Sequence, residues 1–582
     1  MDPNFVERHW NSLPNLRRLR DKGRFSRLAT TTPPQSPVAW STFITGSPPS
    51  AHGIYDFVHR DPVTLQPFSS LSRNEEPRFH LPLGPFRLPL SSPRVASLRQ
   101  GTPFWQLLTA RGIPATIIHM PANYPPAPYG KALAGMGVPD LSGTLGTFTL
   151  FTDDPAEYSH SVTGGRITKV AAVNGRTVLP LEGPPNTLRK DRGVVTTDLT
   201  VDVDLARAAA RLSVGGTLTV LREGEWSGWI TAEFSLLPHM AVVNGIFRVY
   251  IKQLHPRLAI YVSAVNADPL SPALPLSFPS NFSREVALET GQFFTMGIAE
   301  DTSALRQQVF TLAEFRAQAA LVFEDEHRLL LQSLRHFERG LLFFYISSID
   351  QNSHILWGRH EAELLSVYES VDRAIGQVQQ TVPDAELIVL SDHGFTTFDR
   401  AVHLNTWLLH RGFLATNEQP GNNTTLDNAD WSSTEAYAMG LNGLYLNMKG
   451  REKRGVIDPG TQRTALLAKL KEQLTSWRDP LNGRRIVEVV DHFEIPAKNA
   501  AVAPDLIVGY APGYRGSWQA ALGGVPESEI DNNDDAWIGD HCINPADVPG
   551  VLFTSRRGNA MPLSLQDATE FVLQKFGVNS KN

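Results

Sequence analysis

The feature that most constrains the fold is a pair of short apolar runs bounded by polar or turn-forming residues. Leu341–Ser347 follows Gly340, and Glu386–Ser391 is followed by Asp-His-Gly. Runs of this length that are apolar nearly throughout are typical of parallel strands buried on both faces. Apolar residues at three- and four-residue spacing over 315–337 predict an amphipathic helix leading into the first run. The succession of a helix and a buried strand favours an α/β fold with a doubly wound, mostly parallel sheet.

Acidic and histidine residues stand just past both runs. Asp350 and His354 follow the first run, Asp392 and His393 follow the second, and His541 lies far downstream. Taken singly, each is more often a capping or solvated loop residue. Because ligands of open α/β sheets bind outside the carboxyl ends of the strands, the residues taken together predict one shared crevice.

The residue types in these clusters indicate divalent metal ions. Carboxylate oxygens and neutral imidazoles suit a cation such as zinc, and two clusters can hold two ions about 3.5–4 Å apart. Two such ions can offset the charge of phosphoryl oxygens. We therefore expect a two-metal hydrolase of phosphate esters, with Zn²⁺ or Mn²⁺ as its cofactors.

A candidate nucleophile lies near the start of the chain. Ser36 precedes Pro37, and a helix is predicted from Pro37 to Thr45, ended by Gly46. This places Ser36 at the N-cap, where helix N–H groups and the helix dipole favour an anion such as phosphate. Metal coordination would lower the pKa of the Ser36 hydroxyl. An ordinary capping serine is the commoner alternative.

Taken together, the Ser36 segment, the Asp350 and His354 pair, SDHG at Ser391–Gly394 and the late His541 resemble the alkaline phosphatase superfamily. Within it, the chain most resembles the type I phosphodiesterase and nucleotide pyrophosphatase branch, over most of its length. The resemblance implies an alkaline-phosphatase-like fold. It also implies a covalent phosphoserine intermediate, which a metal-activated water hydrolyses.

The resemblance assigns a role to each site residue. The first ion would be bound by Asp350, His354 and His541. The second ion would be bound by Asp392 and His393. Ser36 would bridge the two ions as the nucleophile, where this branch more often has threonine. The nucleotide pyrophosphatases carry an asparagine three residues after the nucleophile. Ala39 stands there instead, so their substrate preference is not implied.

The amino terminus departs from the family pattern. The family's second ion also takes an Asp from a turn after the first core strand, but no apolar strand precedes Ser36. Without that central strand, its neighbours would keep unpaired backbone groups at a cost of roughly several kcal/mol. We expect the gene to encode the missing first core strand upstream of Met1, since Asp2 is a poor substitute. In-frame codons without an apolar run ending in Asp-Gly would contradict this.

Composition limits the partners of the chain. Its 582 residues are 42% hydrophobic and 19% charged, with a net charge of -6, as in ordinary folded proteins. The acidic balance argues against a nucleic-acid scaffold. The partner expected from the candidate site residues is a small-molecule phosphate ester. No run reaches the length of a transmembrane segment. We expect a periplasmic or extracellular location if a signal lies upstream of Met1, and a cytoplasmic one otherwise.

A change to a β-rich sequence pattern in the middle of the chain predicts an insertion in the catalytic core. Residues 1–162 would form the first part of the α/β core, 163–275 a β-rich insertion, and 276–582 the rest of the core with the metal ligands. Hairpin turns are predicted at Asn174-Gly175, Gly215-Gly216 and Asn244-Gly245. The insertion could cap the crevice and select the leaving group, or only stabilise the protein.

Three further residues are weaker candidates for substrate contact or for support of the metal ligands. His52 could support the helix end or lie near the second ion, and His403 and Asn405 could reach the phosphate. The chain has neither a G-x-S-x-G elbow nor a G-x-x-x-x-G-K-[ST] loop, so a serine esterase or a P-loop enzyme lacks its signature.

Phosphodiester or phosphomonoester hydrolysis is the function expected from these features. A phosphomutase of the same superfamily would use the same residues but return the phosphoryl group to the substrate. A catalytically impaired binding remnant, lacking the first metal-ligand Asp, is the other alternative. The natural leaving group, the metal and the oligomeric state stay open at this point.

Overall fold

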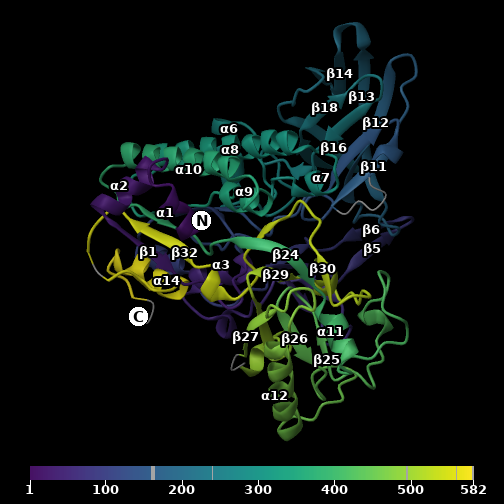
Figure 1. Cartoon of the computed structure of the whole chain (residues 1–582). Coiled ribbons are helices and arrows are strands. Elements are labelled where there is room, and N and C mark those ends of the chain that lie inside the picture. Colours follow the sequence, from purple (N-terminus) through teal and green to yellow (C-terminus); the bar gives the residue numbers. More distant parts are fainter. Residues whose placement is uncertain (159–163, 239, 493–495, 559, 580–582) are drawn as a thin grey trace. The chain divides into compact units, whose positions relative to one another are not determined.

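The computed structural model describes residues 1–158, 164–238, 240–492, 496–558 and 560–579. The chain divides into two compact units, each containing helices and sheets (Figure 1). Unit 1 comprises Met1–Ser72, Ser97–Gly112 and Ile349–Asn582, and unit 2 comprises Arg73–Ala96 and Ile113–Ser348. The chain is thus an α/β protein.

One sheet of unit 1 carries the strand before the Asp-His pair. Strand β23 (Ile388–Leu390) pairs antiparallel with β32 (Gly550–Thr554), which also pairs with β1 (Arg24–Leu28). All of β32 is buried, whereas β23 is half-buried, because β23 has a neighbour on one side only within the described residues. The expectation of a parallel strand buried on both faces over Glu386–Ser391 is therefore wrong in pairing and in burial.

The largest apolar cluster of unit 1 surrounds a second sheet. Its strands, in spatial order, are β25 (Ala436–Ala438), β26 (Gly443–Leu446), β28 (Leu506–Tyr510) and β27 (Val487–Asp491). Helix α12 (Thr461–Ser476) packs on β27 and buries three leucines at four-residue spacing, Leu466, Leu470 and Leu474. A third sheet is built on β24 (Thr396–Val402), which pairs with β29 (Gly513–Gly516) and β31 (Gly539–Asp540).

Unit 2 contains a sheet with three parallel strands. Strand β8 (Ala115–Met120) pairs in parallel with β22 (Leu341–Phe344) and with β9 (Lys131–Ala134). Helices α6 (Phe282–Thr290) and α8 (Leu312–Arg335) pack on this sheet through a shared apolar cluster. The parallel strand predicted after Gly340 is confirmed. It is half-buried rather than buried, since β22 lies at the edge of its sheet in the described chain.

The connection from α8 to β22 follows from local sequence. Thr311 and Glu314 form a capping box that starts the helix, close to the predicted start at 315. Gly340 precedes the strand with φ of 87°, and a Cβ there would lie 2.2 Å from the carbonyl oxygen of Pro114. Only glycine tolerates both conditions, so this position determines where the strand begins.

Most of the β-rich segment folds as antiparallel strands in unit 2. Gly215-Gly216 joins β14 (Ala209–Val214) to β15 (Thr217–Arg222) with both φ angles positive, as predicted for a hairpin. Asn174-Gly175 also forms a turn with positive φ angles. The turn predicted at Asn244-Gly245 is wrong, because both residues lie inside β17 (Ala241–Phe247). A Cβ on Gly245 would lie 2.5 Å from Val265, so close packing explains this glycine.

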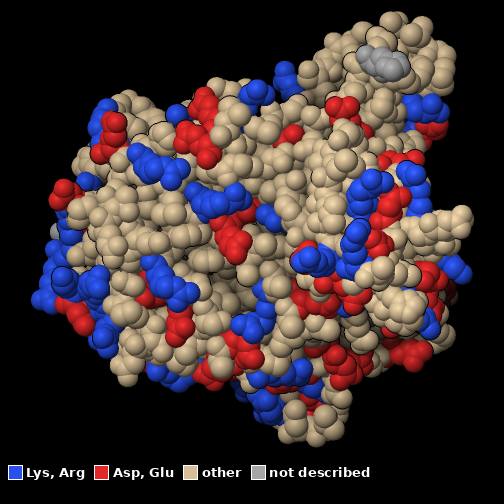
Figure 2. Space-filling model, turned by 90° about the horizontal axis from the view of Figure 1, so that it is seen from above, with Lys and Arg blue, Asp and Glu red and all other residues tan. Residues whose placement is uncertain are grey.

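The surface shows mixed charge. Figure 2 shows Lys and Arg interspersed with Asp and Glu on one face of the molecule, rather than gathered into one basic stripe. Among the described residues, no helix combines the length and the apolar character needed to cross a membrane.

Candidate active site

Helix α3 (Ser36–Thr45) positions the candidate nucleophile in unit 1. Nine of its ten residues, from Ser36 to Ile44, are buried, and Gly46 ends it in the left-handed conformation, as expected. The N-cap is Gln35 rather than Ser36, so Ser36 is the first helical residue. The Gln35 carbonyl oxygen accepts the first hydrogen bonds of the helix, from the N–H groups of Val38 and Ala39 at 2.9 Å. The Gln35 side chain donates to Asp56 and to Asn442, each at 2.7 Å.

Helix α9 (Ser348–Leu356) presents Asp350 and His354 on one face. The two residues are four apart, the spacing at which helical side chains become neighbours. Asp350 Oδ2 lies 3.7 Å from His354 Nε2. A cation could therefore contact both side chains without a change in the helix.

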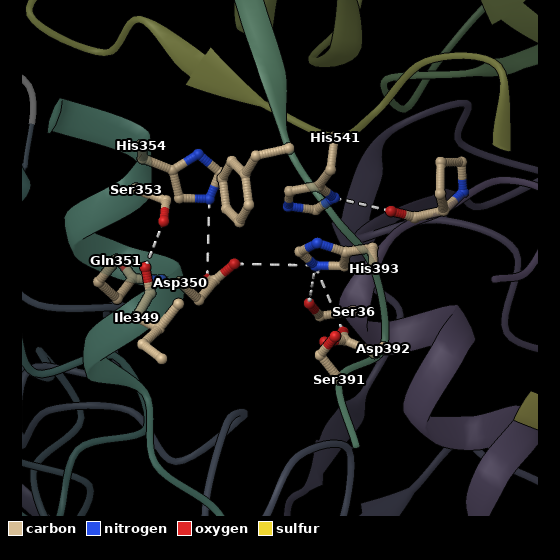
Figure 3. A network of polar contacts seen from close by, with 12 residues as sticks. Ser36, Ile349, Asp350, Gln351, Ser353, His354, Ser391, Asp392, His393 and His541 are labelled. Atoms are coloured by element: carbon tan, nitrogen blue, oxygen red, sulfur yellow. Dashed lines mark hydrogen bonds and ion pairs between the residues drawn. The ribbon is translucent and has the colours of Figure 1, made fainter. Parts of the chain in front are cut away.

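The loop after β23 brings Asp392 and His393 to Ser36. His393 Nε2 lies 3.1 Å from Ser36 Oγ, 3.4 Å from Asp392 Oδ2 and 3.7 Å from Asp350 Oδ1. Figure 3 shows these side chains converging from α3, α9 and the β23 loop. The two predicted clusters and the predicted nucleophile thus lie together.

His541 completes the group from the far end of the chain. It follows β31, and its ring stacks on His393 with centroids 3.5 Å apart. Ligand atoms of Asp350, His354 and His541 lie within 4.8 Å of one another, which is compatible with a single metal ion. Figure 3 shows His541 facing the same space as His354 and His393.

The three imidazoles of the site share one hydrogen-bond pattern. The Nδ1 atoms of His354, His393 and His541 face the carbonyl oxygens of Gly539, Gly394 and Pro34, at 2.8, 3.0 and 2.7 Å. A carbonyl oxygen only accepts, so each Nδ1 carries the proton and each Nε2 keeps its lone pair. Metal-binding histidines commonly have this arrangement, because the carbonyl orients the ring and fixes its tautomer.

Burial keeps these rings neutral at pH 7. Desolvation lowers the pKa of His354, His393 and His541 to about 3 in each case. Phe395 contributes to this apolar environment, with its ring centroid 5.0 to 5.5 Å from all three imidazoles. Neutral imidazole is the form that binds metal ions.

The carboxylates of the site fit a cation for a different reason. Burial raises the pKa of Asp392, because its charge is costly in this environment. Asp392 Oδ2 is buried and accepts no hydrogen bond from the described residues. A divalent ion would compensate this charge, so the donor set of imidazole and carboxylate suits the metal that the sequence predicts.

An ion pair supports the loop that carries His541. Asp540 contacts Arg515 at 2.7 Å and accepts hydrogen bonds from Trp537 Nε1 and from the backbone N–H groups of His541 and Cys542. Desolvation opposes the charge of Asp540, but Arg515 and the neighbouring donors outweigh it and lower the pKa of Asp540. Three hydrogen-bond donors and the Arg515 cation thus hold the backbone from which His541 projects.

Replacing Arg515→Met should destabilise unit 1 by about 3–5 kcal/mol, because Asp540 would remain buried without its cation. Thermal melting and metal content would measure the effect, and both should fall. Arg515→Lys keeps the charge and should lose much less. Equal losses for the two variants would show that packing of the guanidinium, rather than its charge, supports the loop.

The three weaker candidates have structural partners outside this group. His52 contacts Thr42 at 3.0 Å and accepts from the backbone of Ile54. His403 contacts Ser517 and Asp531, at 2.8 and 2.9 Å. Asn405 bonds the backbone of Ala438 in both directions, at 2.8 and 3.1 Å. The structure therefore gives each of them a role in holding loops of unit 1.

Two other positions bear on the family pattern. Asp2 caps helix α1 (Pro3–Arg8) by accepting from the backbone of Phe5 at 2.9 Å. Ala39 is fully buried in α3, so it offers no polar group to a substrate.

Residues that support the site were not found from the sequence. The carbonyl oxygens of Pro34 and Gly539 and the cation of Arg515 act at long range in the chain. A backbone carbonyl carries no sequence signal, and Arg515 lies in a segment without a recognised motif. Only the proline pair before Ser36 could have suggested a rigid acceptor at that point.

A family comparison agrees with this geometry. The model of the type I phosphodiesterase/nucleotide pyrophosphatase family matches residues 1–184 and 273–520, which is more than half of the chain. The chain belongs to this family. It is therefore an enzyme of the phosphoric ester hydrolases, within the alkaline phosphatase superfamily.

Solved structures resemble this chain only weakly. A phosphonoacetate hydrolase from Sinorhizobium meliloti 1021, in complex with phosphonoformate, is 13% identical, with 98% of this chain and 91% of that chain covered and a TM-score of 0.42. Human ectonucleotide pyrophosphatase/phosphodiesterase 5 is 10% identical, with 98% and 92% covered and a TM-score of 0.39. A search of curated proteins found no match.

Proposed function

We propose that this family member is a two-metal hydrolase of phosphate esters that uses Ser36 as its nucleophile. One observation carries the proposal. Ser36 Oγ lies 3.1 Å from the Nε2 atom of His393, on the side of the ring that the Nδ1 hydrogen bond leaves free for a metal ion. A hydroxyl in this position can share a cation with the imidazole.

Two sets of residues would hold the ions. Asp350, His354 and His541 would bind the first, and Asp392 and His393 the second, with Ser36 between them. When bound, the ions supply positive charge that lowers the pKa of a coordinated hydroxyl and offsets the charge of the phosphoryl oxygens. Three imidazoles with carboxylates favour Zn²⁺, although Mn²⁺ accepts the same donors.

The chain's own part in the reaction is a displacement at phosphorus in two steps. Ser36 Oγ, having lost its proton, forms a bond to phosphorus while the bond to the leaving oxygen breaks. A water then adds to the phosphoserine and the bond from phosphorus to Oγ breaks, which releases phosphate or a monoester. Burial of Ser36 in α3 fixes the attacking atom and so lowers the entropic cost of the first step.

The substrate is a phosphodiester or a phosphomonoester. Ala39 gives no amide for the phosphate, so we do not extend the nucleotide preference of the family to this chain. We also propose that residues 163–275 are an insertion in the catalytic core. The family model leaves 185–272 unmatched, which supports that assignment.

Chelation and metal restoration test the proposed function. The chelator-treated enzyme should not hydrolyse bis-p-nitrophenyl phosphate or p-nitrophenyl phosphate, and added Zn²⁺ or Mn²⁺ should restore one or both activities. Isomerisation of a sugar phosphate without phosphate release would instead indicate a mutase. Tight metal binding with no turnover of a broad ester panel would indicate a binding remnant.

A further inference from the structure

A small cavity in unit 2 lies where ligands of parallel sheets bind. Its walls include His119 from the end of β8, Gly135 and Met136 just after β9, and Tyr345 and Ser347 just after β22. These are the carboxyl ends of three parallel neighbours, the edge at which α/β sheets bind their ligands. The cavity volume of about 30 Å³ has room for about two water-sized groups.

Two buried carboxyl groups and one hydroxyl meet beside this cavity. Ser347 Oγ lies 2.8 Å from Glu300 Oε1 and 2.9 Å from Glu326 Oε1. Glu300 and Glu326 are 2% and 6% exposed. Glu326 also accepts from the Ser347 N–H group and from Ser348 Oγ, at 2.8 and 3.1 Å, so most of the donors of this cluster are directed at Glu326.

The carboxyl group of Glu300 is the least satisfied of the cluster. Its Oε2 atom is buried and accepts no hydrogen bond from the described residues. Arg248 and Arg328 both pair with Asp325, another residue of the cavity wall. Burial first, and then repulsion from Glu326, raise the pKa of Glu300 to about 8. At pH 7 the Glu300 carboxyl therefore holds a proton, which a bound cation would displace.

Backbone strain also marks the cavity. His119 has φ of 56°, in the left-handed region that a residue with a Cβ rarely adopts. Such strained residues cluster where a protein holds a ligand. Burial lowers the pKa of His119 to about 4, so this ring adds no positive charge to the cavity at pH 7.

We propose that Glu300, Glu326 and Ser347 form a binding site for one hydrated, hard divalent cation, best matched by Mg²⁺. The oxygen spacings of 2.8 and 2.9 Å are close to the edge of an octahedron, about 3.0 Å when the metal to oxygen distance is about 2.1 Å. Ca²⁺ requires longer edges. Mg²⁺ keeps several waters and binds through one or two carboxylates. The cavity, with about 30 Å³, has room for about two of those waters. None of these three residues is among the proposed hydrolytic residues.

Binding of Mn²⁺, a paramagnetic substitute for Mg²⁺, tests the site on the full chain. The protein is first loaded with Zn²⁺, and free Mn²⁺ is counted by electron paramagnetic resonance. One Mn²⁺ should bind, and excess Mg²⁺ should displace it. Glu300→Gln and Glu326→Gln should each weaken binding at least about tenfold. Asp301→Asn removes a neighbouring carboxylate that Tyr261 and Ala304 already occupy, and should leave binding unchanged.

Further outcomes separate this site from the hydrolytic one. Mn²⁺ binding should persist in His541→Ala, so its presence does not depend on the proposed function. Spin-echo spectra of the bound ion should show no directly coordinated nitrogen, because the proposed protein ligands are oxygens. A nitrogen coupling, or no bound Mn²⁺ in the Zn²⁺-loaded protein, would overturn the proposal even if the Gln variants fail to fold.

Discussion

Ser36→Ala is expected to lower kcat for phosphate ester hydrolysis by at least about 10⁴-fold, while metal content stays nearly unchanged. The reason is chemical. Alanine removes the atom that would bond to phosphorus, but the proposed metal ligands all lie on other elements. Helix α3 should persist, since Pro37 and Gly46 still define its ends. Turnover of bis-p-nitrophenyl phosphate and elemental analysis of the same sample would measure both effects.

Ser36→Thr is the matched variant for this prediction. Threonine keeps the hydroxyl and is the residue that the family more often has at this position. Its extra methyl enters a buried site, where Ser36 is 2% exposed, so activity should fall but remain measurable. Substantial turnover by Ser36→Ala would rule out the nucleophile, and loss of metal in that variant would make Ser36 a ligand needed for the ions to bind.

His541→Ala is expected to weaken binding of the first ion by at least about 100-fold. His541 is one of three side chains whose ligand atoms lie within 4.8 Å of one another, and alanine leaves only Asp350 and His354 from α9. A carboxylate and one imidazole make an incomplete tetrahedral site. Zinc content should fall from two ions to about one, and activity should fall with it, as measured by elemental analysis and by the ester assay.

His403→Ala is a control for the loss of a buried imidazole. His403 is 3% exposed, as is His541, but it bonds Ser517 and Asp531. This variant should be less stable and yet keep its metal. Unchanged zinc in His541→Ala, or equal zinc loss in both variants, would contradict the assignment of His541.

Local sequence was sufficient for several elements. The run after Gly340 folds as a parallel strand, α8 covers most of 315–337, and Gly215-Gly216 forms a hairpin turn. In each of these, apolar spacing or a glycine conformation decides the local structure. The Ser36 segment, the Asp350 and His354 pair, SDHG and the late His541, taken together, were also sufficient to indicate the family.

Other expectations failed because neighbours in space decide them. Nothing in Glu386–Ser391 shows that its partner is β32, from the other end of the chain, with antiparallel direction. Asn244-Gly245 has the sequence of a turn, but Val265 packs against the glycine within a strand. The hydrogen-bond partners of His52, His403 and Asn405 likewise appear only in the tertiary structure.

By itself, the sequence determined which chemistry the chain carries. Residue type decides that imidazole, carboxylate and hydroxyl groups are present, and short-range spacing decides which of them begin a helix or follow a strand. Only the tertiary structure decided that His541 stacks on His393, that three carbonyl oxygens orient the rings, and that Glu300 meets Glu326. Those contacts join residues far apart in the chain, and packing of the whole core, rather than local backbone preference, sets their distances.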